Sequence, residues 1–142
     1  MRPPSIIDFE RAYLASLALG IVNTAIHWQT VERSFEDPAL QTLGAGPGIV
    51  VGILAFSIAI SLLLWFFIAR RASTVAKWIY VVFIAFGVIG IISSLTTLPF
   101  GTQLILNVVA QLLQFFAAWL LFKPDAKAWF TGQWTADARV FD

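Results

Sequence analysis

Four long apolar runs alternate with short polar segments along this 142-residue chain. The runs cover residues 12–28, 49–69, 78–98 and 104–122, and none of them contains Asp, Glu, Lys or Arg. A helix rises about 1.5 Å per residue, so runs of this length cross, or nearly cross, a hydrocarbon core of about 30 Å. The pattern therefore predicts an all-α integral membrane protein. We expect a single domain over residues 1–142, an antiparallel four-helix transmembrane bundle with interfacial amphipathic helices.

The polar segments predict how the four runs are connected. Arg2–Ser5 is typical of a helix start, with prolines before or in the first turn and Ser5 as the N-cap. Residues 29–47 form the longest predicted loop, and a short helix is expected over residues 37–43 within it. The connections between the later runs are short, which makes neighbouring helices antiparallel.

The segment 124–135, after the last apolar run, is expected to lie at the membrane interface as an amphipathic helix. It carries three large aromatic residues, Trp129, Phe130 and Trp134. They are interpreted either as membrane anchors or as a docking surface for a partner protein. The two interpretations predict the same sequence pattern, so both stay open.

The basic residues predict the orientation of the chain in the membrane. With four spans, a single basic residue, Arg33, falls on one side. The opposite side receives all the others: Arg2, Arg11, Arg70, Arg71, Lys77, Lys123, Lys127 and Arg139. Because cytoplasmic loops carry the excess of Lys and Arg, both termini are expected in the cytoplasm.

Polar side chains form a stripe on the last apolar run and a second one on the first run. At 100° per residue the three amides of the last run and the one just before it share one face: Gln103, Asn107, Gln111 and Gln114. An unpaired amide in hydrocarbon costs about 4–8 kcal/mol, so this stripe must face other helices, water or a ligand. Asn23 and His27 lie on one face of the first run, and antiparallel packing brings Asn23 to the depth of Asn107. The sequence predicts a polar seam between the first and last spans.

Three interpretations of this seam compete. The amides and hydroxyls either bond across helices simply to hold the bundle, or line a pocket in its outer half, or border a pore or transport path. A pocket would take a polar or amphipathic small molecule such as a quinone headgroup or a lipid. Ser57 and Ser61 of the second run are expected to bond their own helix backbone and receive no role. The candidate ligand-binding residues are Asn23, His27, Ser94, Thr97, Gln103, Asn107, Gln111 and Gln114.

Composition excludes several other functions. The chain has no cysteine and a single histidine, which leaves no ligand set for a transition metal or a bis-histidine haem within one chain, and we expect no cofactor. The net charge of +1 offers no basic surface for nucleic acid. The spans lack the buried carboxylate of proton-coupled transporters, and no nucleophile–base pair or phosphate loop occurs. A non-enzymatic protein is expected.

Three segments carry a resemblance to other proteins: Arg2–Ser5, Tyr13–Gly20 and Leu120–Phe130. Together they resemble uncharacterised small bacterial inner-membrane proteins with four spans, which implies a multi-pass protein of the cell inner membrane and no particular activity. The absence of buried charge, the small-residue helix faces and the aromatic tail favour an accessory or scaffold subunit of a larger membrane complex. The expected partners are the lipid bilayer and other membrane subunits or further copies of the chain. A ligand-binding protein, or a small transporter or pore, is the alternative.

Overall fold

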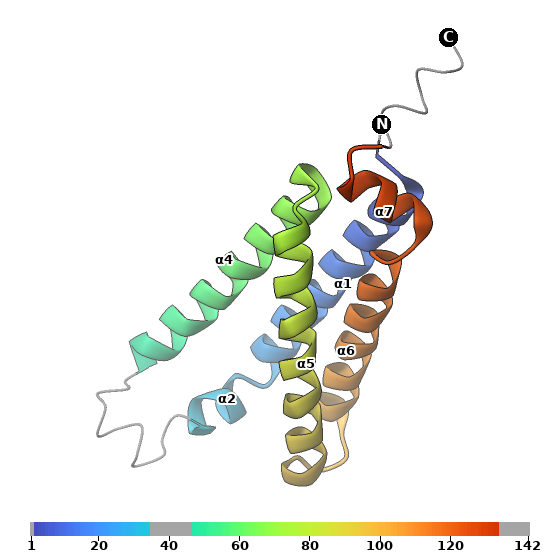
Figure 1. Cartoon of the computed structure of the whole chain (residues 1–142). Helices are drawn as coiled ribbons and strands as arrows, with labels where there is room; N and C mark the ends of the chain where they lie inside the picture. The colour runs from blue at the N-terminus through green and yellow to red at the C-terminus, as the bar shows by residue number, and fades with distance from the viewer. Residues whose placement is uncertain (1, 35–46, 134–142) are drawn as a thin grey trace.

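The computed structural model describes residues 2–34 and 47–133 of the chain. These residues form helices, turns and short connections, and the described part contains no strand. The prediction of an all-α protein is therefore confirmed. The helices, coloured along the chain in Figure 1, are α1 (Pro4–Ile26), α2 (Trp28–Ser34), α4 (Pro47–Arg71), α5 (Thr74–Thr97), α6 (Thr102–Leu120) and α7 (Pro124–Phe130).

Three helices are long and apolar enough to cross a membrane. They include residues Gly48–Arg71 of α4, Thr74–Thr96 of α5 and Thr102–Leu120 of α6. With 23 residues α1 is long enough as well, roughly 34 Å, but its first turns carry Asp8, Glu10 and Arg11 and lower its hydropathy. The structure thus supports a helical membrane protein with three candidate spans, and the predicted helix over 37–43 lies outside the described residues.

The first helix differs from its prediction in where it starts. It begins at Pro4 with Pro3 as the N-cap, and Pro3 provides no side-chain cap. The expectation that Ser5 would be the N-cap is wrong, because Ser5 already lies inside the helix and its groups bond Asp125 of α7. The helix then continues unbroken through its charged first turns into the apolar run.

The predicted loop 29–47 also starts with a helix. After α1 ends at Ile26, the backbone N–H of His27 donates to the carbonyl of Asn23 and closes the last turn. Helix α2 follows immediately at Trp28. The connection after the first long helix is therefore a short turn and a two-turn helix over its described part.

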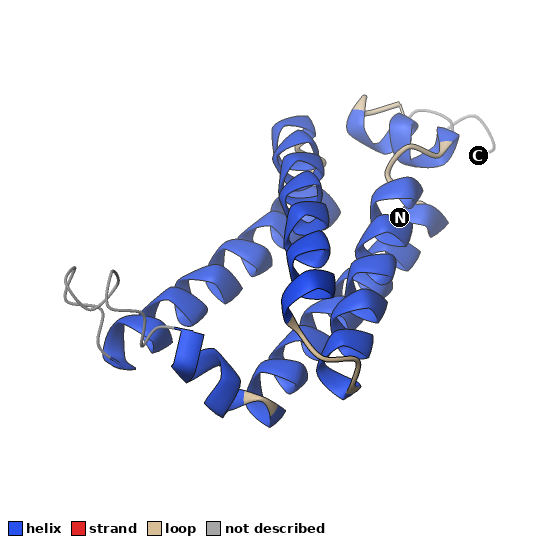
Figure 2. Ribbon diagram, turned by 90° about the horizontal axis from the view of Figure 1, so that it is seen from below, coloured by secondary structure: helices blue, strands red, loops and turns tan. Residues whose placement is uncertain are grey.

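The long helices are close together at one end and separate at the other (Figures 1 and 2). At one end of the molecule, which we call the closed end, helices α1 and α5 begin, helices α4 and α6 end, and α7 packs against them. The open end is the opposite part, where α1 and α5 end and α4 and α6 begin. Helices α1 and α6 are antiparallel and pack against each other, and Asn23 meets Asn107 near the open end. At the closed end Ser5 of α1 meets Asp125 of α7, the helix that follows α6.

The hydrophobic core belongs to the closed end. Three rings lie at its centre, with Phe9 to Tyr13 at 5.4 Å, Phe9 to Tyr80 at 5.8 Å and Tyr13 to Tyr80 at 5.2 Å between centroids. Tyr13 also donates a hydrogen bond to the carbonyl of Ser61 and so ties α1 to α4. All five helices of the closed end contribute buried apolar residues: Ile6, Phe9, Ala12, Tyr13, Leu64, Ile68, Ala69, Ala76, Tyr80, Ile84, Ala117, Leu120, Leu121 and Ala126.

Helix α4 leaves the other helices towards the open end, so the bundle is not uniformly compact. The small residues that the sequence offers for close packing are not at a helix contact, because a Cβ added at Gly48 or Gly52 would meet no atom within 4 Å. The bulky residues Ile53 and Phe56 of α4 instead line a space opposite Phe83 of α5. This separation creates the cavity described next.

Candidate ligand-binding cavity

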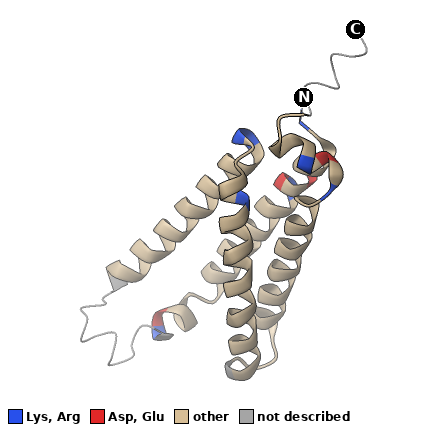
Figure 3. Ribbon diagram, in the orientation of Figure 1, with Lys and Arg blue, Asp and Glu red and all other residues tan. Residues whose placement is uncertain are grey.

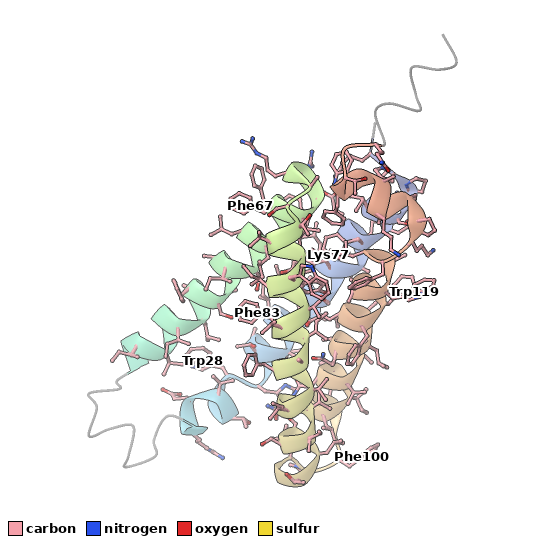
Figure 4. All side chains as sticks on the ribbon, viewed as in Figure 1. Trp28, Phe67, Lys77, Phe83, Phe100 and Trp119 are labelled. Carbon is pink, nitrogen blue, oxygen red and sulfur yellow. The ribbon has the colours of Figure 1, made fainter. Side chains whose placement is uncertain are left out.

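A cavity of about 590 Å³ lies between the four long helices. Trp28 of α2 borders it at the open end (Figure 4). Among the described residues its polar lining consists of hydroxyl, amide and indole groups, with no charged side chain. The hydroxyl and amide residues that line it are Ser16, Thr24, Ser57, Ser61, Ser94, Asn107, Gln111 and Gln114.

A second cavity of about 340 Å³ adjoins the first on the side of the closed end. The two share Ser57, Ser61 and Gln114. The smaller one continues to the rings of Tyr13 and Tyr80, and the Tyr80 hydroxyl donates to the backbone carbonyl of Gln114 at 3.1 Å. The polar lining therefore extends from the open end to the edge of the aromatic core.

Several hydroxyls in this lining donate to their own helices. Ser16 donates to the carbonyl of Tyr13 at 2.7 Å, Ser61 to that of Ser57 at 2.9 Å and Ser94 to that of Gly90 at 2.9 Å. A serine that donates in this way keeps its oxygen lone pairs as acceptors. These three hydroxyls satisfy their protons locally, and the donors left for another molecule must come from elsewhere.

The amides of α1 and α6 meet beside the cavity. Asn23 is buried, and its Nδ2 donates to Asn107 Oδ1 at 2.7 Å and to the backbone carbonyl of Gln103 at 3.4 Å. His27 Nδ1 lies 3.1 Å from the carbonyl of Asn23, which fits the tautomer that donates from this nitrogen. These contacts hold α1 against α6 near the open end.

Gln111 of α6 lies against α5. Its side-chain amide rests on Gly87, and a Cβ added at that glycine would be only 2.6 Å from Gln111 Oε1. In the described part of the chain Gln111 Nε2 is buried and has no hydrogen-bond partner. Gly87 and Gln111 both line the larger cavity. An unpaired buried donor thus stands at the wall of a space that can hold another molecule.

The structure distributes the predicted site residues over three groups. Ser94, Asn107, Gln111 and Gln114 line the cavity. Asn23, His27 and Gln103 lie beside it in the contact between α1 and α6 and its outer end. The side chain of Thr97, at the end of α5, is outside the described part.

Sequence reasoning missed the contribution of α4. Ser57 and Ser61 received no role, and Ser61 does bond its own helix, yet both line the two cavities. A signal for this was present, since Leu54, Ser57, Ile58 and Ser61 follow the spacing of one helix face and all border the larger cavity.

The aromatic residues of the tail pack on the closed end. Trp129 Nε1 donates to the carbonyl of Ile68 at 3.4 Å, and the Phe130 ring lies 5.1 Å from Lys77 Nζ. Both rings pack against the core, and Lys77 itself, labelled in Figure 4, is buried. Trp134, the third aromatic residue of the predicted segment, lies outside the described residues.

Charged groups also connect the helices at the closed end. The Asp125 carboxylate accepts from the Ser5 backbone N–H at 3.0 Å and from the Ser5 hydroxyl at 2.8 Å, at the first turn of α1. Burial pushes the pKa of Asp125 upward, but the hydrogen bonds outweigh this effect and hold its pKa below the usual value of 3.8. Glu10 pairs with Arg2 and, at 3.5 Å, with Arg70 of α4.

Comparison with protein-family models, curated proteins and solved structures finds no match to this chain. The fold and the apolar helices define the class, a small helical membrane protein. Among the described residues no three His, Asp or Glu side chains gather where they could hold a metal ion. Both cavities of the described structure have room for another molecule, and the larger one is lined by more polar side chains.

Proposed function

We propose that this protein is a four-span membrane protein that binds an uncharged amphipathic small molecule between its helices. The observation that carries the proposal is the 590 Å³ cavity with a polar but uncharged lining. Its volume is in the range of sites that bury a small organic molecule, about 300–1,000 Å³. The protein acts in this proposal as a binding protein and not as an enzyme.

The four-span arrangement is supported by the pairing of α1 with α6. Helix α6 is one of the candidate spans, and α1 runs antiparallel beside it over a similar length. The charges of α1 that lower its hydropathy all lie at the closed end, where Glu10 is paired with Arg2 and Arg70. A helix in this position crosses the same membrane as its neighbour.

The charge distribution supports the proposed orientation in the cell inner membrane. Figure 3 shows most of the described basic residues on the ribbon at the closed end, whereas Arg33 belongs to α2 at the open end. The positive-inside rule then puts the closed end, with both termini, in the cytoplasm. The cavity opens towards the outer half of the membrane, where α4 leaves the bundle.

The lining indicates the chemistry of the ligand. A charged group would have no counter-charge in this cavity, and unpaired charge at membrane depth is strongly unfavourable. A purely apolar molecule would leave the side-chain amides of Gln111 and Gln114 without partners. A neutral headgroup with hydrogen-bonding oxygens and an apolar tail satisfies both conditions.

Filling the cavity provides the test. A Cβ at Gly90 would meet no atom within 4 Å, so the leucine side chain of Gly90→Leu should occupy part of the cavity without a backbone clash. Gly52→Leu is the matched control, since Gly52 is equally open but does not line either cavity. The protein and both variants would be purified from native membranes and their bound small molecules extracted and quantified by mass spectrometry.

We expect one neutral amphiphile in stoichiometric amount in the parent protein and in Gly52→Leu. Gly90→Leu should retain at least about tenfold less of it, a loss equivalent to about 1.4 kcal/mol of binding free energy. If the parent protein carries no such molecule, or if Gly90→Leu carries as much as the control, the proposed function is wrong.

A second candidate function, an accessory subunit of a larger membrane complex, is supported by α4. This helix is exposed over most of its surface, and open space surrounds the small residues Gly48 and Gly52 that suit close helix packing. Purification in mild detergent at native expression tests it. Stoichiometric partner proteins that are lost in Gly52→Leu would support this function, and recovery of the chain alone would rule it out.

A further inference from the structure

Resting on the proposed function, we infer that the bound molecule carries a carbonyl oxygen and that Gln111 recognises this oxygen through its side-chain amide. The inference assigns Gln111 as the specificity-determining residue of the cavity. It narrows the ligand class from neutral amphiphiles in general to those with a ketone, quinone or ester headgroup.

The hydrogen-bonding groups that line the cavity differ in whether they already have a partner within the protein. Three lining hydroxyls, those of Ser16, Ser61 and Ser94, already donate to carbonyls of their own helices. Asn107 Oδ1 accepts from Asn23. Among the described side chains that line the cavity, Gln111 Nε2 is the donor that is both buried and without a hydrogen-bond partner. A donor in that position is best matched by a pure acceptor, and a carbonyl oxygen is one.

The Gln111 side chain has room to change its orientation. Its amide rests on Gly87, where the missing side chain leaves the room that it occupies. The same residue borders the cavity, so a rotation about its own side-chain bonds turns the amide from Gly87 towards the open space. The unpaired state against Gly87 costs free energy that a ligand carbonyl can recover.

Two kinds of membrane molecule present such a carbonyl to a cavity of this size. One is a quinone headgroup, and the other is the ester region of a neutral glycerolipid. The recognition by Gln111 is the same for both, and binding probes of each kind distinguish them. The probes are decylubiquinone, dioctanoylglycerol and, as the carbonyl-free comparison, decylbenzene.

The experiment measures the affinity of the full-length protein in nanodiscs for each probe, with Gly90→Leu as the baseline for probe dissolved in lipid. Gln111→Leu removes the amide, and because that amide has no protein partner the variant should fold normally. Gln103→Leu is the control, since its side chain does not line either cavity. We expect Gln111→Leu to bind the preferred carbonyl probe about 3- to 10-fold more weakly, with decylbenzene unaffected.

A second variant tests the orientation of the amide. Gly87→Ala puts a methyl group only 2.6 Å from the present position of Gln111 Oε1 and should displace the amide into the cavity. A donor already turned towards the ligand loses less freedom on binding, so we expect the carbonyl probe to bind about two- to tenfold more tightly. Unchanged or weaker binding would contradict the assignment of Gln111.

Different results would contradict the proposed function and the role of Gln111. If no probe, including decylbenzene, binds the parent protein above the baseline, the proposed function itself is wrong. If all probes bind with or without a carbonyl and Gln111→Leu has no effect, the cavity remains a binding site and only the role of Gln111 is overturned. A selective effect on decylubiquinone or on dioctanoylglycerol identifies the source of the carbonyl.

Discussion

The closed and open ends of this molecule are built from the same helices in opposite ways. At the closed end the rings of Phe9, Tyr13 and Tyr80 pack together and five helices share one buried core. At the open end α4 separates from the other helices, and a polar cavity takes the place of a core. The packing that stabilises the fold is therefore concentrated at one end of the molecule, and the other end has room for a ligand.

Helix α7 connects two of the long helices at the closed end. Its Asp125 bonds the first turn of α1, and its Trp129 reaches the carbonyl of Ile68 on α4. Ala126, between them, is fully buried. A helix of seven residues thereby holds two long helices that are distant in sequence.

The largest effect should come from the aromatic core. Phe9→Ala removes a fully buried ring that contacts two tyrosines, and we expect a loss of about 3 kcal/mol in the free energy of unfolding. Unfolding in an SDS titration, followed by circular dichroism, measures it. The control is Ile26→Ala at the open end, where the side chain is 63% exposed and the loss should stay below about 0.5 kcal/mol. Equal losses at the two ends would contradict the comparison.

The next effect concerns the contact between α7 and α1. Asp125→Ala removes a carboxylate that caps the first turn of α1, where negative charge is also favourable to the helix dipole, and should cost about 1 kcal/mol. Asp8→Ala is the matched control, because Asp8 is exposed and makes a 3.8 Å ion pair within the same helix. The same SDS titration compares them. If Asp8→Ala lowers the free energy of unfolding as much as Asp125→Ala does, the contact between α7 and α1 has no special role in stability.

The same carboxylate predicts a pH dependence. The pKa of Asp125 is lower in the folded protein than its usual value of 3.8, so its contribution to stability is fully present above that value. This contribution should be lost as the pH falls through the folded pKa. Unfolding measured between neutral pH and about pH 3 should show this loss in the parent protein and a smaller one in Asp125→Asn. Parallel pH profiles would show that the Ser5–Asp125 contact does not contribute.

The smallest effect is expected at the polar contact near the open end. The hydrogen bond between Asn23 and Asn107 should contribute about 0.6 kcal/mol, as is usual between membrane helices. A double-mutant cycle with Asn23→Ala and Asn107→Ala isolates this coupling. A coupling above about 2 kcal/mol would mean that the open end is held as firmly as the closed end.

The features that depend on local pattern could be predicted from the sequence. Apolar runs without charge define the long helices, and the amide spacing of α6 places Gln111 and Gln114 on one face. Two apolar runs lie between the first run and the last. Because each successive span reverses direction, α1 and α6 are expected to be antiparallel. These properties need only the period of a helix and the thickness of a membrane.

Contacts between residues that are far apart in the sequence could not be predicted. Ser5 and Asp125 are 120 residues apart, so no local pattern indicates that one caps the helix of the other. Small residues at Gly48 and Gly52 permit close packing, but they do not determine whether a helix arrives there. The cavity exists because α4 departs, and this depends on the balance of contacts over the whole bundle.

Two adjacent residues of α5 provide a direct test of whether the cavity holds a specific small molecule. Ile91 lines the cavity, whereas Ile92 is 59% exposed on the outer surface. Each would be replaced in turn by the photoreactive p-benzoylphenylalanine, and the protein irradiated in native membranes and weighed by intact mass spectrometry. We predict one discrete small-molecule adduct at position 91 and a spread of bulk phospholipid adducts at position 92. The same phospholipid adducts at both positions would show that the cavity holds only ordinary lipid and would contradict the account.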